Sequence, residues 1–302
     1  MKRFIFFIAL IALLPVLSRP GYAAGGTKQA AVAQKAEAAN PADFVGSEVC
    51  ETCHAEVAKK FENNPHNKIT LTHGAGTACE SCHGPGKAHV EGGGDVTKIK
   101  QLAKLTPAQV SETCLGCHAG THPNFARAPH AKAGVGCTSC HSIHAGDTED
   151  KLLKASQPQL CYQCHTDIKP SFDMPFHHKV NEGLVKCTDC HDVHGTFNAN
   201  NVKSTADQNM ICTKCHAEVR GPWVFEHAAV KGEGCMACHT PHGSQNPRLL
   251  TVANINQLCN QCHSPVGGST VHGINAGSAE RQPCINCHTF IHGSNINPAF
   301  LR

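Results

Sequence analysis

The chain repeats one pentapeptide, Cys-x-x-Cys-His, ten times, and the ten copies use all 20 of its cysteines. A clear example is the segment CTSCHSIH, in which Cys137, Cys140 and His141 form the motif. The cysteine pairs are Cys50 and Cys53, Cys79 and Cys82, Cys114 and Cys117, Cys137 and Cys140, Cys161 and Cys164, Cys187 and Cys190, Cys212 and Cys215, Cys235 and Cys238, Cys259 and Cys262, and Cys284 and Cys287. The adjacent histidines are His54, His83, His118, His141, His165, His191, His216, His239, His263 and His288. Any fold of this chain must therefore accommodate ten equivalent sites.

Two thiols three positions apart beside a histidine suit the covalent attachment of haem c. The thiols add to the two vinyl groups on one edge of the porphyrin, and the histidine becomes the proximal iron ligand. Zinc ribbons and thioredoxin-like sites also use CxxC, but zinc gives no reason for a histidine after every second cysteine. Disulfides fit an even cysteine count in an exported chain, but they do not require one spacing ten times. The motifs therefore predict ten covalently attached haem c groups, with zinc sites and disulfides as alternatives.

The first residues are typical of an exported protein. Lys2 and Arg3 precede an apolar run at residues 4–17, and small residues follow at 21–24. This pattern predicts a signal peptide over residues 1–24 and a periplasmic location. A retained membrane anchor is the alternative, although a 14-residue run containing Pro15 is short for a span. No later segment is predicted to span a membrane.

Composition indicates that cofactor, rather than side chains, supplies the apolar interior. Charged residues make up only 16%, and there is one Trp beside 27 Gly and 17 Pro. The formal charge of +3 includes Lys2, Arg3 and Arg19 of the signal peptide, and each haem adds two propionates. The basic composition is thus no argument for nucleic-acid binding. We expect a multihaem cytochrome c fold that is mostly coil, with short α-helices and little or no β-sheet.

The motifs, named here by their first cysteine, alternate between two kinds. The first kind mostly ends a short helical pattern, as at residues 106–113, where Thr106 caps Pro107, and at 204–211. The second kind mostly follows glycine-containing loops, such as residues 74–76, 134–136 and 232–234. The first kind comprises the motifs of Cys50, Cys114, Cys161, Cys212 and Cys259; the second comprises those of Cys79, Cys137, Cys187, Cys235 and Cys284.

Motifs of one kind recur about every 50 residues, which predicts five tandem dihaem units. Their approximate bounds are 44–105, 106–154, 155–203, 204–251 and 252–302, which together form the decahaem domain 44–302. Residues 25–43 are predicted to be a flexible leader. Units that contact mainly their neighbours predict an elongated molecule wrapped around a chain of ten haems.

Ten further histidines occur in register with these units, one before and one after each second-kind motif. They are His66, His89, His130, His144, His178, His194, His227, His242, His272 and His292. A histidine three residues after a proximal ligand cannot reach the far face of the same haem, so we expect it to ligate the other haem of its unit. This number of histidines predicts that two histidines coordinate each of the ten irons. The alternative is that they are ordinary surface or core histidines.

Three histidines are surplus to this scheme: His73, His122 and His177. His73 could replace His66 or His89, and His177 could replace His178.

Methionine cannot be the general second ligand, because only Met174, Met210 and Met236 remain after the signal peptide. Without the methionine ligand that raises the potential, the haems are predicted to be of low potential. Ligand exchange at a metal requires an open position. Closing every iron with histidine therefore favours an electron carrier over an enzyme, and no catalytic residue is assigned.

Several segments resemble those of the MtrA/DmsE/PioA-type decahaem cytochromes. They include CESCHGPGKAH, SFDMPFHHKVNEGLVKCTDCHDVHG and APHAKAGVGCTSCHSIH, and the resemblance extends over about residues 44–293. It implies a periplasmic cytochrome that inserts into an outer-membrane β-barrel porin and exchanges electrons with periplasmic and extracellular cytochromes, terminal reductases or minerals. The longer first unit and the position of His292, one residue late, depart from the pattern.

Three alternative functions share these features. A soluble periplasmic shuttle or storage cytochrome would lack the porin, whereas a multihaem reductase would need a five-coordinate, high-spin haem. A filament-forming cytochrome would be recognised by electron microscopy.

Overall fold

The structure is a computed structural model that describes residues 40–68, 78–144, 150–203, 209–263 and 282–302. The chain separates into two compact parts between Ala39 and Asn40, and every described residue belongs to the later part, Asn40–Arg302. The predicted signal peptide, the predicted leader up to residue 39 and the expected loop at residues 74–76 lie outside the described residues.

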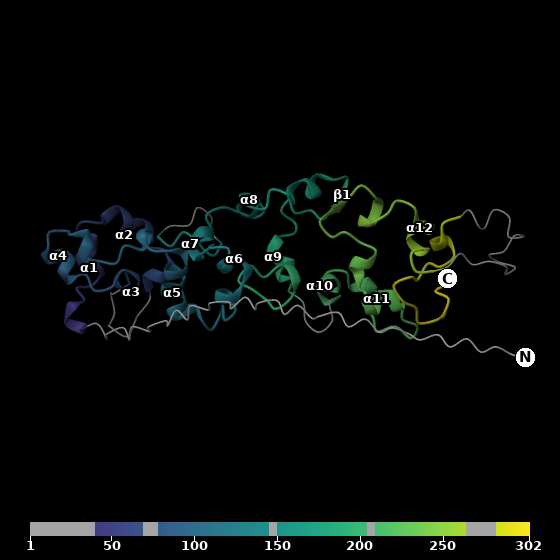
Figure 1. The fold of residues 1–302 in the computed structure, drawn as a ribbon, viewed down its shortest axis with the longest axis horizontal. Coiled ribbons are helices and arrows are strands. Elements are labelled where there is room, and N and C mark those ends of the chain that lie inside the picture. Colours follow the sequence, from purple (N-terminus) through teal and green to yellow (C-terminus); the bar gives the residue numbers. More distant parts are fainter. Residues whose placement is uncertain (1–39, 69–77, 145–149, 204–208, 264–281) are drawn as a thin grey trace, which may run out of the picture. The chain divides into compact units, whose positions relative to one another are not determined.

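Short helices joined by irregular chain make up most of the described structure (Figure 1). The α-helices are α1 (Ser47–Glu51), α2 (Ala55–Phe61), α3 (Glu80–His83), α4 (Lys87–Glu91), α5 (Pro107–His118), α6 (Pro129–Lys132), α7 (Cys137–Cys140), α8 (Gln159–Tyr162), α9 (Cys187–Cys190), α10 (Met210–Thr213), α11 (Ala228–Gly232) and α12 (Ile255–Cys259). The 3₁₀ helices are η1 (Pro41–Asp43), η2 (Pro65–Lys68), η3 (Val96–Lys98), η4 (Leu102–Lys104), η5 (Phe125–Arg127), η6 (Lys169–Asp173), η7 (Ala199–Asn201), η8 (Ala217–Val219), η9 (Cys235–Ala237), η10 (Pro247–Leu249) and η12 (Cys284–Asn286).

Sheet is confined, in the described ranges, to two strands of two residues. β1 (Phe176–His177) pairs antiparallel with β2 (Gly243–Ser244), with Phe176 opposite Ser244. This ladder joins the third unit to the fourth. The expectation of a largely coiled chain with short helices and little sheet is confirmed. Among the described residues, no helix combines the length and the apolarity that crossing a membrane requires.

The helix α5 shows how the sequence places a first-kind motif. The N–H of Gln109 donates to the Thr106 hydroxyl at 3.4 Å, and the N–H of Thr106 donates to Gln109 Oε1 at 2.9 Å. This capping box, with Pro107 at the first helical position, fixes the start of the helix. The helix ends at His118, so the Cys114 motif occupies its last turns, as predicted.

The other first-kind motifs also begin on α-helices, but shorter ones. Cys50 lies in α1, Cys161 in α8, Cys212 in α10 and Cys259 in α12. Of the helix expected over residues 204–211, positions 204–208 lie outside the described residues, and α10 begins at Met210.

Glycines in the left-handed region lead into three second-kind motifs. Gly134 (φ 77°), Gly183 (φ 79°) and Gly234 (φ 83°) adopt positive φ angles that a side chain disfavours. Gly136, directly before Cys137, is required for a different reason. A Cβ there would lie 2.8 Å from the carbonyl oxygen of Pro107, so its absence lets α7 pack against α5.

Few side chains form a core. The buried apolar residues among those described are Ala78, Val110, Phe125, Ala128, Phe172, Val180 and Leu250. Seven such residues are too few for a conventional hydrophobic interior, which agrees with an interior supplied by cofactor.

Candidate haem sites

Each CxxCH motif folds as a helical turn. In nine of the ten motifs the histidine N–H donates to the carbonyl of the first cysteine at 2.9–3.1 Å, and in the remaining one His118 ends α5. Residues three and four apart on a helix share a face, so both thiols and the imidazole lie on one side of the turn. All twenty cysteines carry free thiols that are half-buried or exposed. These thiols stand for the sulfurs of thioether bonds.

Within a unit, the two motifs meet at their first cysteines. Hydrogen bonds between side chains join Cys50 to Cys79, Cys114 to Cys137, Cys161 to Cys187 and Cys259 to Cys284. The hydrogen bond from Cys114 lowers the pKa of the Cys137 thiol to about 5, which reflects how close the two sulfurs lie.

A polar side chain ahead of each first-kind motif fixes this joint by accepting a hydrogen bond from a backbone N–H of the second-kind motif. The acceptors lie three residues before the first cysteine in four units: Ser47 for Cys79 (3.4 Å), Ser111 for Cys137 (3.3 Å), Asn209 for Cys235 (3.0 Å) and Asn256 for Cys284 (2.9 Å). In the third unit Pro158 occupies that position, and Gln157 Oε1 accepts from the Thr188 N–H at 3.1 Å. Sequence reasoning missed these residues, although the recurring Ser or Asn three positions before the motif is a signal that could have found them.

Second cysteines of neighbouring units lie near enough for their charges to interact. Partial desolvation by the surrounding protein is the main cause that raises the pKa values of these thiols in four second-kind motifs, although the Cys190 side chain stays exposed, and a thiol of the following unit also raises each pKa. The neighbours are Cys82 with Cys117, Cys140 with Cys164, Cys190 with Cys215, and Cys238 with Cys262. Each motif is therefore adjacent to the next along the chain.

Seven of the ten second cysteines are exposed to solvent. Cys53 and Cys287 are exposed, and the Thr52 hydroxyl donates to the Cys53 sulfur at 3.8 Å. The protein side chains around these two sulfurs leave them open to solvent. The physical reason is that the cover predicted for them is porphyrin rather than protein. Their thioether role stays a prediction, and the same exposure holds for Cys117, Cys164, Cys190, Cys215 and Cys262.

Nine proximal imidazoles each face a second imidazole at a ring-centroid distance of 6.0–6.4 Å. The pairs are His54–His89, His83–His144, His118–His66, His141–His194, His165–His130, His191–His242, His216–His178, His239–His292 and His263–His227. Two metal–nitrogen bonds of about 2 Å, with about 1.2 Å from each nitrogen to its ring centre, give a spacing of about 6.4 Å. The geometry thus fits one iron between each pair. The remaining proximal histidine is His288, and its predicted partner His272 lies outside the described residues.

The expectation that a CHxxH histidine serves the other haem of its own unit is wrong. His144 of the second unit faces His83 of the first, and His194 of the third faces His141 of the second. The histidine that precedes a second-kind motif reaches the other way, as His130 of the second unit faces His165 of the third. Because the two motifs of a unit are joined at their first cysteines, the flanking histidines extend from that joint to the neighbouring units. Among the nine described pairs, one joins two histidines of the same unit: His89 faces His54 in the first unit.

Burial keeps several of the second imidazoles neutral. Desolvation lowers the pKa values of His66, His144, His242 and His292. It lowers the pKa of His194 to about 4, with a further contribution from the nearby His122. A ring nitrogen binds a metal only when it carries no proton, so these environments favour ligation.

Backbone carbonyls orient the proximal rings of the second-kind motifs through Nδ1. The acceptors are Lys100 O for His83 (3.0 Å), Lys151 O for His141 (2.8 Å), Asn200 O for His191 (2.8 Å), Arg248 O for His239 (2.8 Å) and Ala299 O for His288 (2.6 Å). Such a bond fixes the tautomer and directs Nε2 to the iron. Three of these carbonyls belong to residues with φ angles of 53–59°, Lys151, Asn200 and Arg248. That conformation costs about 1–2 kcal/mol per residue.

In four first-kind motifs, those of Cys50, Cys114, Cys161 and Cys212, the second imidazole is the ring that a hydrogen bond orients. Nδ1 of His89 bonds Asp95 O at 2.9 Å, that of His130 bonds Val193 O at 3.0 Å, and that of His178 bonds Pro241 O at 2.5 Å. At His66 the acceptor is the Asn64 side chain, at 3.1 Å. The proximal rings of these motifs are exposed.

The choice between His177 and His178 is decided by their partners. The ring of His178 faces His216, whereas Nδ1 of His177 bonds Met174 O at 2.5 Å and its Nε2 bonds Glu182 Oε1 at 3.1 Å. Both nitrogens of His177 are therefore engaged away from the haem sites.

His122 lies between two of the paired sets. Its ring centroid is 6.2 Å from His118 and 3.9 Å from His194, and it is half-buried. The remaining surplus histidine, His73, lies outside the described residues.

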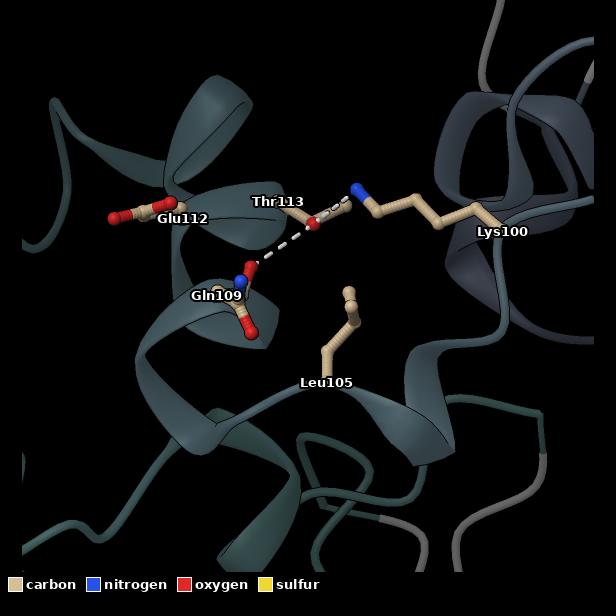
Figure 2. A pocket seen from close by; sticks show the side chains of 5 residues that line it. All are labelled: Lys100, Leu105, Gln109, Glu112 and Thr113. Carbon is tan, nitrogen blue, oxygen red and sulfur yellow. Dashed lines mark hydrogen bonds between the residues drawn. The ribbon is translucent and has the colours of Figure 1, made fainter. Parts of the chain in front are cut away.

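Lys100 connects the first unit to the second. Its backbone N–H and carbonyl both bond His83, and its ammonium donates to Thr113 Oγ1 at 2.6 Å, directly before Cys114. Figure 2 shows this lysine reaching across to α5, whose Thr113 hydroxyl donates to the Gln109 carbonyl. The pocket of about 390 Å³ between them is lined by Lys100, Leu105, Gln109, Glu112 and Thr113. This lining contains neither a haem-motif cysteine nor a histidine.

Comparison with known proteins gives two family matches. The doubled CXXCH motif matches residues 130–170, 177–221 and 227–268, and the family of cytochrome c554 and c-prime matches residues 89–142. Helical CxxCH turns, paired imidazoles and these matches define a multihaem c-type cytochrome, which binds haem c through its CxxCH motifs. The zinc and disulfide alternatives are set aside.

Two relatives narrow the class. The chain is 31% identical over 279 residues to the multihaem cytochrome MtrA of Shewanella baltica, a match that covers 83% of this chain and 79% of that protein. It is 36% identical over 84 residues to the cytochrome c-type protein NrfB of Escherichia coli, which covers 27% of this chain and 41% of that protein. The chain belongs to the MtrA family of multihaem cytochromes.

Proposed function

We propose that the chain is a periplasmic electron carrier with ten haems, and that it forms the wire of an outer-membrane porin–cytochrome conduit. In this role it serves extracellular electron transfer or anaerobic respiration. The ten CxxCH motifs attach the haems and supply the proximal ligands. The ten histidines in register with the units, His272 included, supply the distal ligands.

The observation that carries the proposal is the adjacency of each motif to the next. Within a unit, the first cysteines of the two motifs are neighbours, and in the fourth unit Asn209 links the two motifs. Between units, the second cysteines lie near one another. Electron tunnelling falls steeply with the distance between donor and acceptor edges. A series of haems attached through adjacent cysteines therefore supports transfer over the whole length of the chain.

The imidazole pairs support a carrier rather than an enzyme. Each bound haem supplies a one-electron Fe(III)/Fe(II) couple. In the described ranges nine pairs of imidazoles have a spacing that suits one iron between each pair, and we propose that both imidazoles of each pair would bind it. Substrate binding at iron would require one of them to leave. The residues that line the pocket beside Lys100 include no histidine or cysteine.

The partners proposed are a β-barrel porin and, at the two ends of the path, periplasmic and extracellular cytochromes or a terminal reductase. The support is the extent of the similarity to MtrA. The test is purification of the full chain from membranes of the producing organism under gentle detergent, with identification of proteins that stay bound. We expect one barrel protein in constant ratio to the cytochrome.

A transport assay separates the proposal from its alternatives. The purified complex is inserted into liposomes that contain a reduced, impermeant dye, and an external acceptor is added. Conduit function predicts oxidation of the internal dye. Purification without a barrel, and no transport in liposomes, would instead identify a periplasmic shuttle. A high-spin haem with turnover of a small oxyanion would identify a reductase.

A further inference from the structure

Two histidines cross each junction between units in opposite directions, and at two junctions a hydrogen bond ties them together. Nδ1 of His130 bonds the carbonyl of Val193, the residue directly before His194. Nδ1 of His178 bonds the carbonyl of Pro241, directly before His242. In both cases, the residue ahead of one crossing histidine holds the ring of the other.

At the first junction the side chain of Asn64 makes the same connection. Its Nδ2 donates to the carbonyl of Ile143, directly before His144, at 2.6 Å. Its Oδ1 accepts from the His66 N–H at 2.9 Å and pairs with His66 Nδ1 at 3.1 Å. Asn64 is 4% exposed, so water does not compete for these bonds.

The fourth junction differs. His292 stands one residue later than its counterparts, and the local chain pairs Phe225 with Ser294 through two backbone hydrogen bonds of 2.8 and 2.9 Å. The His227 ring makes no hydrogen bond to any residue in the described ranges. The extra residue thus accompanies the loss of the connection.

The angle between the two imidazole planes also differs between the first three junctions and the fourth. The interplanar angles are 73° for His66–His118, 69° for His130–His165 and 55° for His178–His216. At the fourth junction His227–His263 has an angle of 15°, and the pairs around second-kind irons have angles of 8–30°. The His54–His89 pair also has a small angle, 17°, so among the nine described pairs only these three rings are turned far from their partners.

At each of the first three junctions the CHxxH histidine crosses in one direction and a second histidine crosses in the other. We propose that the residue before the CHxxH histidine sets the ring plane of that second histidine. At the first junction Asn64 is the positioning residue that links the two. The inference rests on the proposed haem ligation. It assigns three irons, those of the Cys114, Cys161 and Cys212 motifs, to a class with steeply crossed imidazole planes.

Crossed and parallel planes have different spectroscopic signatures. Parallel imidazoles separate the energies of the two iron d orbitals that interact with the ring π systems, which gives a rhombic low-spin EPR spectrum. Crossed planes bring those orbitals close in energy, which gives a single large g value. In the oxidised wild-type protein we therefore expect these three irons in the large-g signal and the other six irons between described imidazole pairs in rhombic signals.

The test compares Asn64→Leu with a matched control, Asn67→Leu. Asn67 lies one residue after His66 and is exposed. Its side chain donates to Glu62 O at 3.1 Å, and its backbone N–H, which the substitution keeps, donates to Asn64 O at 2.9 Å. In Asn64→Leu the large-g signal should fall by one iron, that of the Cys114 motif, and the potential of that haem should rise because His66 loses its acceptor. Asn67→Leu should leave both unchanged.

Asn64→Asp supplies a second variant in case the leucine prevents haem loading. A carboxylate keeps an acceptor for His66 but cannot donate to Ile143. It makes the ring more electron-rich, so the potential of the affected haem should fall, opposite in sign to the leucine variant. General damage to the fold would not give shifts of opposite sign.

The outcomes separate this inference from the function on which it rests. Ten low-spin haems in the wild type with no large-g class, or an unchanged signal in Asn64→Leu, would overturn the positioning role and leave the electron carrier intact. A wild-type protein without bis-histidine irons would overturn both.

Discussion

Replacing His194 by alanine should open the iron of the Cys137 motif and leave the adjacent Cys187 motif unchanged. His194 stands three residues after His191, yet its ring faces His141 at 6.2 Å with an interplanar angle of 15°. Removing the imidazole leaves one axial position vacant on one iron of ten. About a tenth of the total haem should become high-spin and bind carbon monoxide when reduced.

The surroundings of His194 determine how much stability the His194→Ala variant loses and in which genetic background it must be measured. The ring lies 3.9 Å from His122 and 6.5 Å from Phe125, so its removal should lower the free energy of unfolding by about 1–2 kcal/mol. His122 is close enough to take over as ligand. The measurement is therefore made in both the wild-type and the His122→Ala background, as a carbon monoxide difference spectrum scaled to total haem.

Motif deletions identify which iron has opened. With Cys137 and Cys140 replaced by serine, His194→Ala should cause no further change, because its iron is absent. With Cys187 and Cys190 replaced, it should still open one iron. The reverse result, or ten closed irons in His122→Ala/His194→Ala, would refute ligation across units.

Three further predictions concern other parts of the chain. His272→Ala should open one iron while His177→Ala opens none, as read from the same difference spectra; an open iron in the latter would contradict its engagement with Glu182. Gly195→Ala should destabilise the protein by about 2–4 kcal/mol in chemical unfolding, because φ is 111° and a new Cβ would lie 2.7 Å from the Ala128 Cβ. Gly134→Ala, with φ 77° and no neighbour within 4 Å, should cost only about 1–2 kcal/mol, and equal losses would show that packing plays no part. Glu80→Ala should cost about 1–3 kcal/mol, since its buried carboxylate accepts hydrogen bonds from three backbone N–H groups.

Much of the local structure can be predicted from the sequence because it depends on interactions between residues close together in the chain. The Cys-x-x-Cys-His spacing dictates a helical turn, and Thr106, Pro107 and Gln109 dictate the start of α5. The division into two kinds of motif also follows from local signals, helix caps before one kind and glycines before the other. Nine of the ten second histidines chosen by register face proximal rings in the described ranges, and their role as iron ligands stays a prediction.

The partner of each second histidine was not predictable by the same means. Register places His130 and His194 along the chain, but their partners His165 and His141 are decided by how units join in space. That joint depends on contacts between first cysteines and on acceptors such as Ser111, which a count of histidines does not include. Ring orientation depends on backbone carbonyls, which every residue carries, so no residue type marks Val193 or Pro241.

The central claim is that two imidazoles close every iron, and low-temperature EPR of the oxidised, fully loaded protein tests it most directly. The account predicts that all of the iron, ten per chain, integrates as low-spin, with no high-spin signal. A high-spin signal equal to even one iron per chain in the wild type would contradict it.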